Sequence, residues 1–104
     1  MAGVVRNQVP SGGASAIGFL SINTNSQPYI INGIEAPPGP TAKIFILQAI
    51  GDISINHENV SANAEDRIYF PSGSPLTLYS GQSLLFIYNP SVSRWIGVIA
   101  GNQL

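Results

Sequence analysis

The chain consists of short apolar segments in which hydrophobic and polar residues alternate, separated by turn-forming residues. Residues 53–56 (ISIN) and 76–79 (LTLY) both show this alternation. Successive side chains of a β-strand point to opposite faces, so the pattern is typical of strands with one buried face. No segment has the 3.6-residue periodicity of an amphipathic helix. The pattern therefore predicts an all-β fold.

Two longer apolar runs cover residues 43–50 (KIFILQAI) and 83–88 (SLLFIY). The run over residues 43–50 predicts a strand that is buried on both faces, and the run over residues 83–88 predicts a buried strand. We expect further short strands at the remaining apolar segments, which are residues 16–22, 29–31, 53–56, 67–70, 76–79 and 94–100.

Turn signals separate the predicted strands. Residues 36–40 (APPGP) include three prolines, which lack the backbone donor that a sheet requires, so we expect a stiff loop there. Roughly eight strands at a spacing of about 8–12 residues favour a sandwich, jelly roll or small barrel. We therefore predict a single small antiparallel β-sandwich or jelly-roll-like domain over residues 16–104, without an internal repeat of fixed period.

Residues 1–15 (MAGVVRNQVPSGGAS) differ from the rest of the chain because they are small, Gly-rich and interrupted by Pro10. Such a segment would be disordered on an isolated domain, but in an assembly it could lie extended across a neighbour. Val4, Val5 and Val9, with Arg6 among them, could anchor it. We predict an extended N-terminal arm over residues 1–15.

The composition suggests a protein that is covered by partners. Of 104 residues, 44% are apolar and only 9% are charged, with a net charge of −1, whereas a usual charged fraction is about 25%. A small monomer normally depends on surface charge to remain unassociated. The alternative is a neutral surface rich in Ser, Asn, Gln and Thr.

Charge and composition also exclude several classes of function. Four basic residues scattered among five acidic ones cannot neutralise several phosphates, so we expect no nucleic-acid partner. No run of about 18 apolar residues is present, so we expect no membrane-spanning helix. The chain has no cysteine, which removes disulfides and thiolate metal sites.

His57, the only histidine, is followed by Glu58. A metal or acid–base site would use this pair, but metal coordination needs three or four converging ligands. The alternative is a structural hydrogen bond, either in the turn after Ile55 or across a subunit contact. We predict the structural role, with no catalytic residue, no metal and no cofactor.

Two arginines and the aromatic residues are further candidates. Arg67 and Arg94 each begin a predicted strand, and an arginine fork can hold loop carbonyls and carboxylates such as that of Glu58. Trp95 and the four tyrosines could form a platform for stacking sugars, although aromatic residues on strands more often belong to a core or an interface. We expect His57, Glu58, Arg67, Arg94 and Trp95 to serve as structural or oligomer contacts.

The C-terminal half contains a set of short motifs between about Ile44 and Val98. They are a strand ending at His57-Glu58, an Asp66-Arg67 pair, an aliphatic-Thr-aliphatic strand (76–78), a Gly-x-Ser turn (81–83) and the final Ser93-Arg94-Trp95. This set resembles a β-rich module of tailed-bacteriophage virion proteins, which is found at the ends of tail-fibre, head-fibre and collagen-like proteins.

The resemblance implies a trimerising β-structure that serves adhesion or decoration, without enzymatic activity, on the exterior of the capsid or tail. The chain departs from that family at its front, where no long shaft repeat precedes the module. We therefore expect a homotrimeric capsid decoration (cement) protein. Its arm (Val4, Val5, Arg6 and Val9) would contact the major capsid protein or another virion protein. The alternative is a tail-fibre tip that recognises host polysaccharide.

Overall fold

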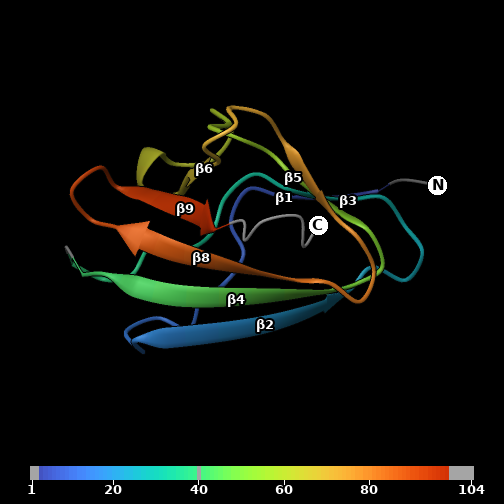
Figure 1. The fold of residues 1–104 in the computed structure, drawn as a ribbon, viewed down its shortest axis with the longest axis horizontal. Helices are drawn as coiled ribbons and strands as arrows, with labels where there is room; N and C mark the ends of the chain where they lie inside the picture. The colour runs from blue at the N-terminus through green and yellow to red at the C-terminus, as the bar shows by residue number, and fades with distance from the viewer. Residues whose placement is uncertain (1–2, 40, 99–104) are drawn as a thin grey trace.

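The computed structural model describes residues 3–39 and 41–98, and almost all of its regular structure is β (Figure 1). The only helical element among these residues is a single 3₁₀ turn, η1 (Ala64–Asp66). The prediction of an all-β protein is therefore confirmed. The strands are β1 (Val4–Arg6), β2 (Ile17–Asn23), β3 (Tyr29–Ile31), β4 (Lys43–Ile50), β5 (Ile53–Ile55), β6 (Ile68–Tyr69), β7 (Leu76–Leu78), β8 (Ser83–Asn89) and β9 (Arg94–Val98).

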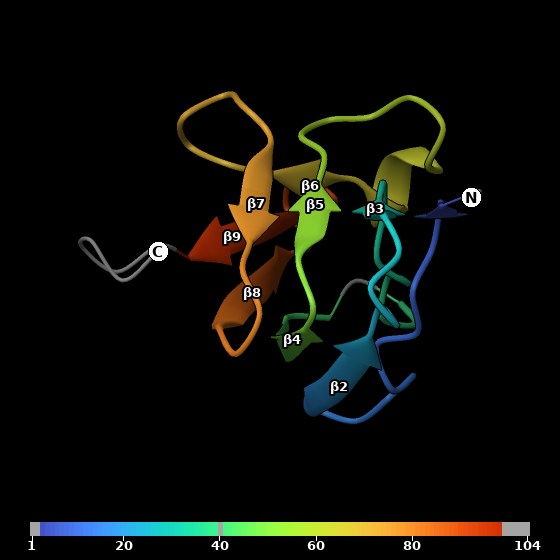
Figure 2. The same ribbon diagram turned by 90° about the vertical axis from the view of Figure 1, so that its right-hand side faces the viewer.

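The strands form two sheets that enclose one core. The smaller sheet has the order β1-β3-β5-β7, and the larger has the order β2-β4-β8-β9-β6. Up to β8, each strand lies in the opposite sheet from the strand before it. In Figure 2, β2, β4 and β8 of the larger sheet lie below the smaller sheet, and β6 lies at its level. The chain thus passes from one sheet to the other at almost every connection.

This alternation gives the first half of the chain a solenoid-like winding. β1, β3 and β5 are parallel neighbours in one sheet, and β2 and β4 are parallel neighbours in the other. The chain then reverses, so that β7 pairs antiparallel to β5 and β8 antiparallel to β4. Both sheets are therefore mixed. The predicted antiparallel sandwich of jelly-roll type is wrong, because side-chain alternation identifies strands but does not identify their neighbours.

Three asparagines mark successive coils of the solenoid. Asn32 donates to the Asn7 carbonyl at 2.8 Å over a separation of 25 residues, and Asn56 donates to the Asn32 carbonyl at 2.7 Å over 24 residues. Each asparagine follows the strand of its coil in the smaller sheet. Stacked amides of this kind hold equivalent positions of neighbouring coils in register. The fold therefore contains a structural repeat that the sequence analysis missed.

The core is filled by the inward-facing residues of both sheets. Along β4, Phe45, Leu47 and Ala49 are completely buried. The ring of Phe45 lies 6.2 Å from that of Phe86 and 5.9 Å from that of Trp95. Burial of these large side chains supplies the main driving force for folding. One core serves both sheets.

From residue 3 onward, the predicted N-terminal arm is part of this body. β1 pairs with β3 along its whole length, and Val9 is completely buried in the core. Val9 is held there by its N–H, which donates to the Gly33 carbonyl at 3.1 Å. From residue 3 to Val9, the chain belongs to the first coil of the solenoid and is not a free arm, and residues 1–2 of the predicted arm lie outside the described residues.

Candidate functional site

The outer face of the larger sheet is the most unusual surface of the protein. On this face, the strand register aligns apolar side chains from neighbouring strands into two continuous rows. One row crosses all five strands and the other crosses four. The rows consist of Ile17, Ile44, Ile87, Ile96 and Tyr69, and of Phe19, Ile46, Leu85 and Val98.

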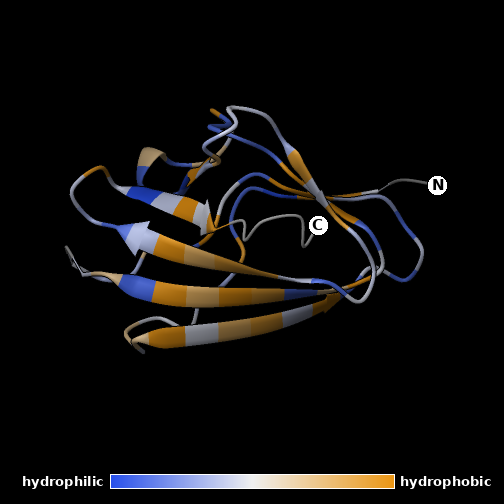
Figure 3. Ribbon diagram, in the orientation of Figure 1, coloured by the Kyte–Doolittle hydropathy of each residue, from blue (hydrophilic) through white to orange (hydrophobic). Residues whose placement is uncertain are grey.

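These side chains are in contact with solvent. Ile17 is 61% exposed and Phe19 62% exposed, and Ile87 at the centre of the face is 41% exposed. The outer face leaves on the order of 600 Å² of apolar surface exposed, which is at the upper end of what a monomer shows in one patch. Figure 3 shows the mainly hydrophobic bands along β2 and β4.

Polar residues border the two rows at both ends. Ser21, Gln48 and Ser83 form the next row at one end, and Asn89 pairs with Arg94 at the other. An apolar centre with a polar rim is the usual anatomy of a protein–protein interface. The outer face has this anatomy.

β4 explains why the sequence produces such a face. It was predicted to be buried on both sides, but its residues alternate between buried and solvent-facing positions. Phe45 and Leu47 point into the core, whereas Ile44 and Ile46 point outward. The continuous apolar run therefore contributes to two faces of the sheet, of which residues 3–39 and 41–98 bury only one.

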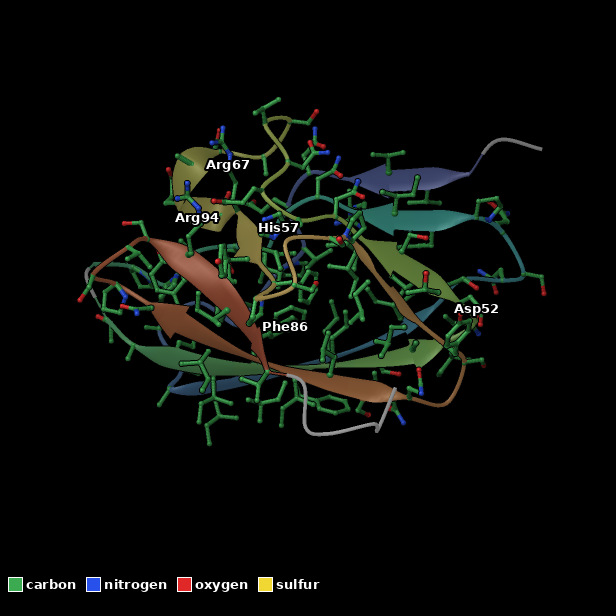
Figure 4. All side chains as sticks on the ribbon, turned by 45° about the horizontal axis from the view of Figure 1, so that its top comes forward. Asp52, His57, Arg67, Phe86 and Arg94 are labelled. Atoms are coloured by element: carbon green, nitrogen blue, oxygen red, sulfur yellow. The ribbon has the colours of Figure 1, made fainter. Side chains whose placement is uncertain are left out.

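Arg94 and Glu58 form an ion pair at the margin of the outer face. The Arg94 guanidinium also donates to the Ala64 carbonyl at 2.9 Å, so it holds both a carboxylate and a loop carbonyl, as predicted. Tyr69, Val92 and Ile96 line a hollow of about 310 Å³ together with this pair. Figure 4 shows Arg94 on the same side of the molecule as His57 and Arg67, away from Asp52.

His57 makes a structural hydrogen bond and a ring contact. Its Nδ1 accepts the N–H of Phe70 at 3.0 Å, and its ring lies 5.0 Å from that of Tyr69. The bond fixes the turn after β5 to the end of β6. Within residues 3–39 and 41–98, no group of three or more His, Asp or Glu side chains is arranged to hold a metal.

Arg67 and Trp95 also act within one copy of the chain. Arg67 donates to the Ala62 carbonyl at 3.2 Å. Trp95 is completely buried, and its indole N–H donates to the Ile34 carbonyl at 2.9 Å. Of the two roles expected for Trp95, these contacts are structural, because its partners lie in the core of its own subunit.

The four residues assigned to the arm differ in exposure, because they occupy different positions in the first coil. Val9 is buried and cannot reach a partner, and Val4 is half-buried in β1. Val5 is 59% exposed, and Arg6 is exposed with its guanidinium 3.5 Å from the Tyr29 hydroxyl. Only Val5 and Arg6 remain available on the surface.

The sequence analysis missed a buried carboxylate, that of Asp66, at a point where three segments of the chain meet. Asp66 is buried, and its two carboxylate oxygens accept the Gln8 side-chain amide at 2.8 Å and the Ala36 N–H at 2.9 Å. Its backbone carbonyl accepts the Ile34 N–H at 2.9 Å. Spacing along the chain gave no sign of this cluster, because its members come from different coils.

The tyrosines and Trp95 do not form one platform. Trp95 and Tyr88 are buried together, with their rings 5.0 Å apart. Tyr69 borders the hollow at Arg94, whereas Tyr29 lines a separate, open hollow of about 570 Å³. Thr24, Ser26, Gln27, Asp52 and Ser54 supply polar groups around Tyr29.

The comparisons with known proteins show no relative: no family model, no curated protein and no solved structure matches the chain. In the part of the chain that the structure describes, no helix has the length and apolar character needed to cross a bilayer. Function therefore has to be argued from the surfaces and contacts described above.

Proposed function

We propose that this chain is a non-enzymatic structural protein that functions by assembly, as a trimeric capsid decoration protein of a tailed bacteriophage. The observation that carries this proposal is the outer face of the larger sheet. One of its two apolar rows crosses all five strands of the sheet and the other crosses four. The resemblance of the C-terminal half to phage virion modules supplies the biological setting.

Sister copies are the partners that best suit the outer face. The two rows are made of aliphatic and aromatic side chains without a charge, so a second copy meets no like-charge repulsion. Burying about 600 Å² of apolar surface contributes about 15 kcal/mol per copy before the entropy costs of association. A standard interface buries about 800 Å² per partner, so the outer face with its polar rim is of suitable size.

The remaining polar chemistry of the chain supports a structural role. His57 and Arg67 each bond to a backbone group of their own subunit. The buried Lys43 ammonium likewise donates to the Gly13 carbonyl at 2.8 Å. These contacts stabilise loops, and each of the three side chains binds a backbone group of its own subunit.

Capsid binding would follow from the trimer. A protein that binds only the assembled shell raises the free energy of disassembly by mass action. Three copies of a binding surface on one trimer rebind locally, which strengthens a weak individual contact. On each copy, Val5 and Arg6 of β1 remain exposed for contact with the shell, whereas Val9 does not.

The sharpest test is Ile87→Lys, which places a charge at the centre of the outer face. We expect sedimentation equilibrium to show a trimer for the original chain and a monomer for Ile87→Lys. Thr77→Lys is the matched control, because Thr77 is exposed on β7 in the other sheet. Circular dichroism should show that both variants keep their β-structure.

Capsid binding is measured separately, by co-sedimentation with phage shells that lack the protein. We expect the original chain and Thr77→Lys to be retained on the shells and Ile87→Lys to be lost. A stable monomer at about 100 μM for the original chain, with no retention on shells, would contradict the proposal.

The open hollow beside Tyr29 favours a second candidate, a tail-fibre tip that binds host polysaccharide. An aromatic ring with hydroxyl, amide and carboxylate groups around it suits a sugar ring. Incubation with host cells should then deplete the protein from solution, and Tyr29→Ala should abolish depletion. Retention on shells without depletion by cells would favour decoration.

A further inference from the structure

The first coil of the solenoid, residues 3–23, forms an open end of the stack. Its two strands, β1 and β2, are edge strands of the two sheets. Asn7, the last residue of the asparagine ladder, accepts from Asn32, and its own amide group makes no hydrogen bond among the described residues. Solenoids normally need a polar cap at such an end, because an uncapped coil presents unpaired backbone and apolar surface.

β2 is the longest edge strand among the described residues. It spans seven residues, against three in β1, three in β7 and two in β6. Its sequence IGFLSIN contains no charge and no proline, the devices that commonly prevent edge-to-edge pairing. Ile17 and Phe19 on this strand are the most exposed apolar residues of the outer face.

The hydrogen bonds to β4 show which backbone groups of β2 are free. Ile44 N–H donates to the Ala16 carbonyl at 3.0 Å, and Thr24 N–H donates to the Ile50 carbonyl at 2.9 Å. Even-numbered residues of β2 therefore face β4, and the N–H and C=O groups of Ile17, Phe19 and Ser21 point to the open edge. Figure 1 shows no strand beyond β2 on that side.

We propose that β2 is a strand-addition site for a second copy of this chain, which pairs antiparallel through its own β2 about a two-fold axis. In the register centred on Phe19, this residue lies opposite its own copy and Ile17 lies opposite Ser21. About six main-chain hydrogen bonds then form between the free groups. The absence of charge on the strand means that the two copies do not repel each other.

This contact differs from the outer-face contact of the proposed trimer. It is isologous and uses the backbone edge of the first coil. Its area is at the low end for protein interfaces, so we expect a reversible dimer contact with a Kd of about 1–100 μM. Combined with a closed trimer, it would link one trimer to the next.

The first test uses Phe19→Cys in a chain that has no other cysteine. Residues directly opposite in a hydrogen-bonded antiparallel pair have Cα atoms about 5.5 Å apart, which suits a disulfide. Under mild oxidation at about 100 μM, we expect Phe19→Cys to form a covalent dimer. Tyr79→Cys, which is exposed beyond the end of β7, is the matched control and should remain largely uncrosslinked.

The second test uses Ser21→Pro, with Ser21→Ala as its control. The Ser21 N–H makes no bond to β4, so proline at this position removes an outward donor while β2 stays paired. We expect the edge contact to weaken at least about tenfold in Ser21→Pro and to persist in Ser21→Ala, as measured by sedimentation in an Ile87→Lys background.

The two proposals fail in distinguishable ways. If the trimer depends on Ile87 but Phe19→Cys forms no more cross-linked dimer than Tyr79→Cys, only the proposed edge contact is overturned. If Phe19→Cys forms the cross-linked dimer but Ile87→Lys leaves association unchanged, the edge contact is supported and the outer-face trimer is overturned. If Ser21→Pro unfolds, the cross-linking result decides the question.

Discussion

The asparagine ladder should make a measurable contribution to stability, and Asn32→Ala removes its central member. Asn32 is buried, donates to Asn7 at 2.8 Å and accepts from Asn56 at 2.7 Å. Truncation deletes both bonds and leaves the Asn7 carbonyl and the Asn56 amide without these partners. A net loss of about 1 kcal/mol per bond, plus the cost of unsatisfied groups, predicts a decrease of about 2–4 kcal/mol in the free energy of unfolding.

The single tryptophan provides the assay. Trp95 is completely buried in the core, so its fluorescence should shift to longer wavelength when the protein unfolds. With an m-value of about 1.5 kcal/mol/M, the predicted loss lowers the urea midpoint by roughly 2 M. The measurements are made at one protein concentration, because self-association also changes the apparent stability.

Asn63→Ala is the matched control. Asn63 is exposed and makes no side-chain capping bond at η1, so its truncation should change the free energy of unfolding by less than about 0.5 kcal/mol. The ladder interpretation is refuted if Asn32→Ala is no more destabilising than this control. A double-mutant cycle with Asn7→Ala should also show coupling, because the two amides share one bond.

Three further substitutions test the remaining contacts by the same urea assay. Asp66→Ala leaves the Gln8 amide and the Ala36 N–H without their acceptor, so it should cost about 2–3 kcal/mol; a loss below 0.5 kcal/mol would contradict the role of this carboxylate. In Gly97→Ala the new Cβ would collide with the Phe70 ring, so we expect a loss of about 1–3 kcal/mol, and no loss would mean that the ring moves freely. Glu58→Gln should cost less than about 1 kcal/mol because the ion pair is partly exposed; a larger loss would reveal a stronger structural role.

Much of the local structure could be predicted from the pattern of the chain. The alternation in residues 53–56 and 76–79 correctly indicated β5 and β7, because a strand with one buried face must alternate. The pairing of Arg94 with Glu58 and the structural bond of His57 were also anticipated. These features depend on residue type and on local spacing.

The winding of the chain could not be read from the same pattern. A signal was nevertheless present, since Asn7, Asn32 and Asn56 each follow a strand of the smaller sheet at separations of 25 and 24 residues. The coils otherwise share little sequence, so the period was not visible without the structure. The buried Val9 was missed for a related reason: Gly and Pro around it suggested an arm, while its partner Ile34 lies one coil away.

By itself, the sequence determined that the protein is made of short β-strands, carries little charge and holds no cysteine chemistry. Those properties follow from residue types and their order, which act locally. Only the tertiary structure decided which strands are neighbours, and with them the solenoid winding, the buried Asp66 cluster and the two outward apolar rows. Pairing depends on contacts between residues far apart in the chain, and alternation is the same for every possible partner.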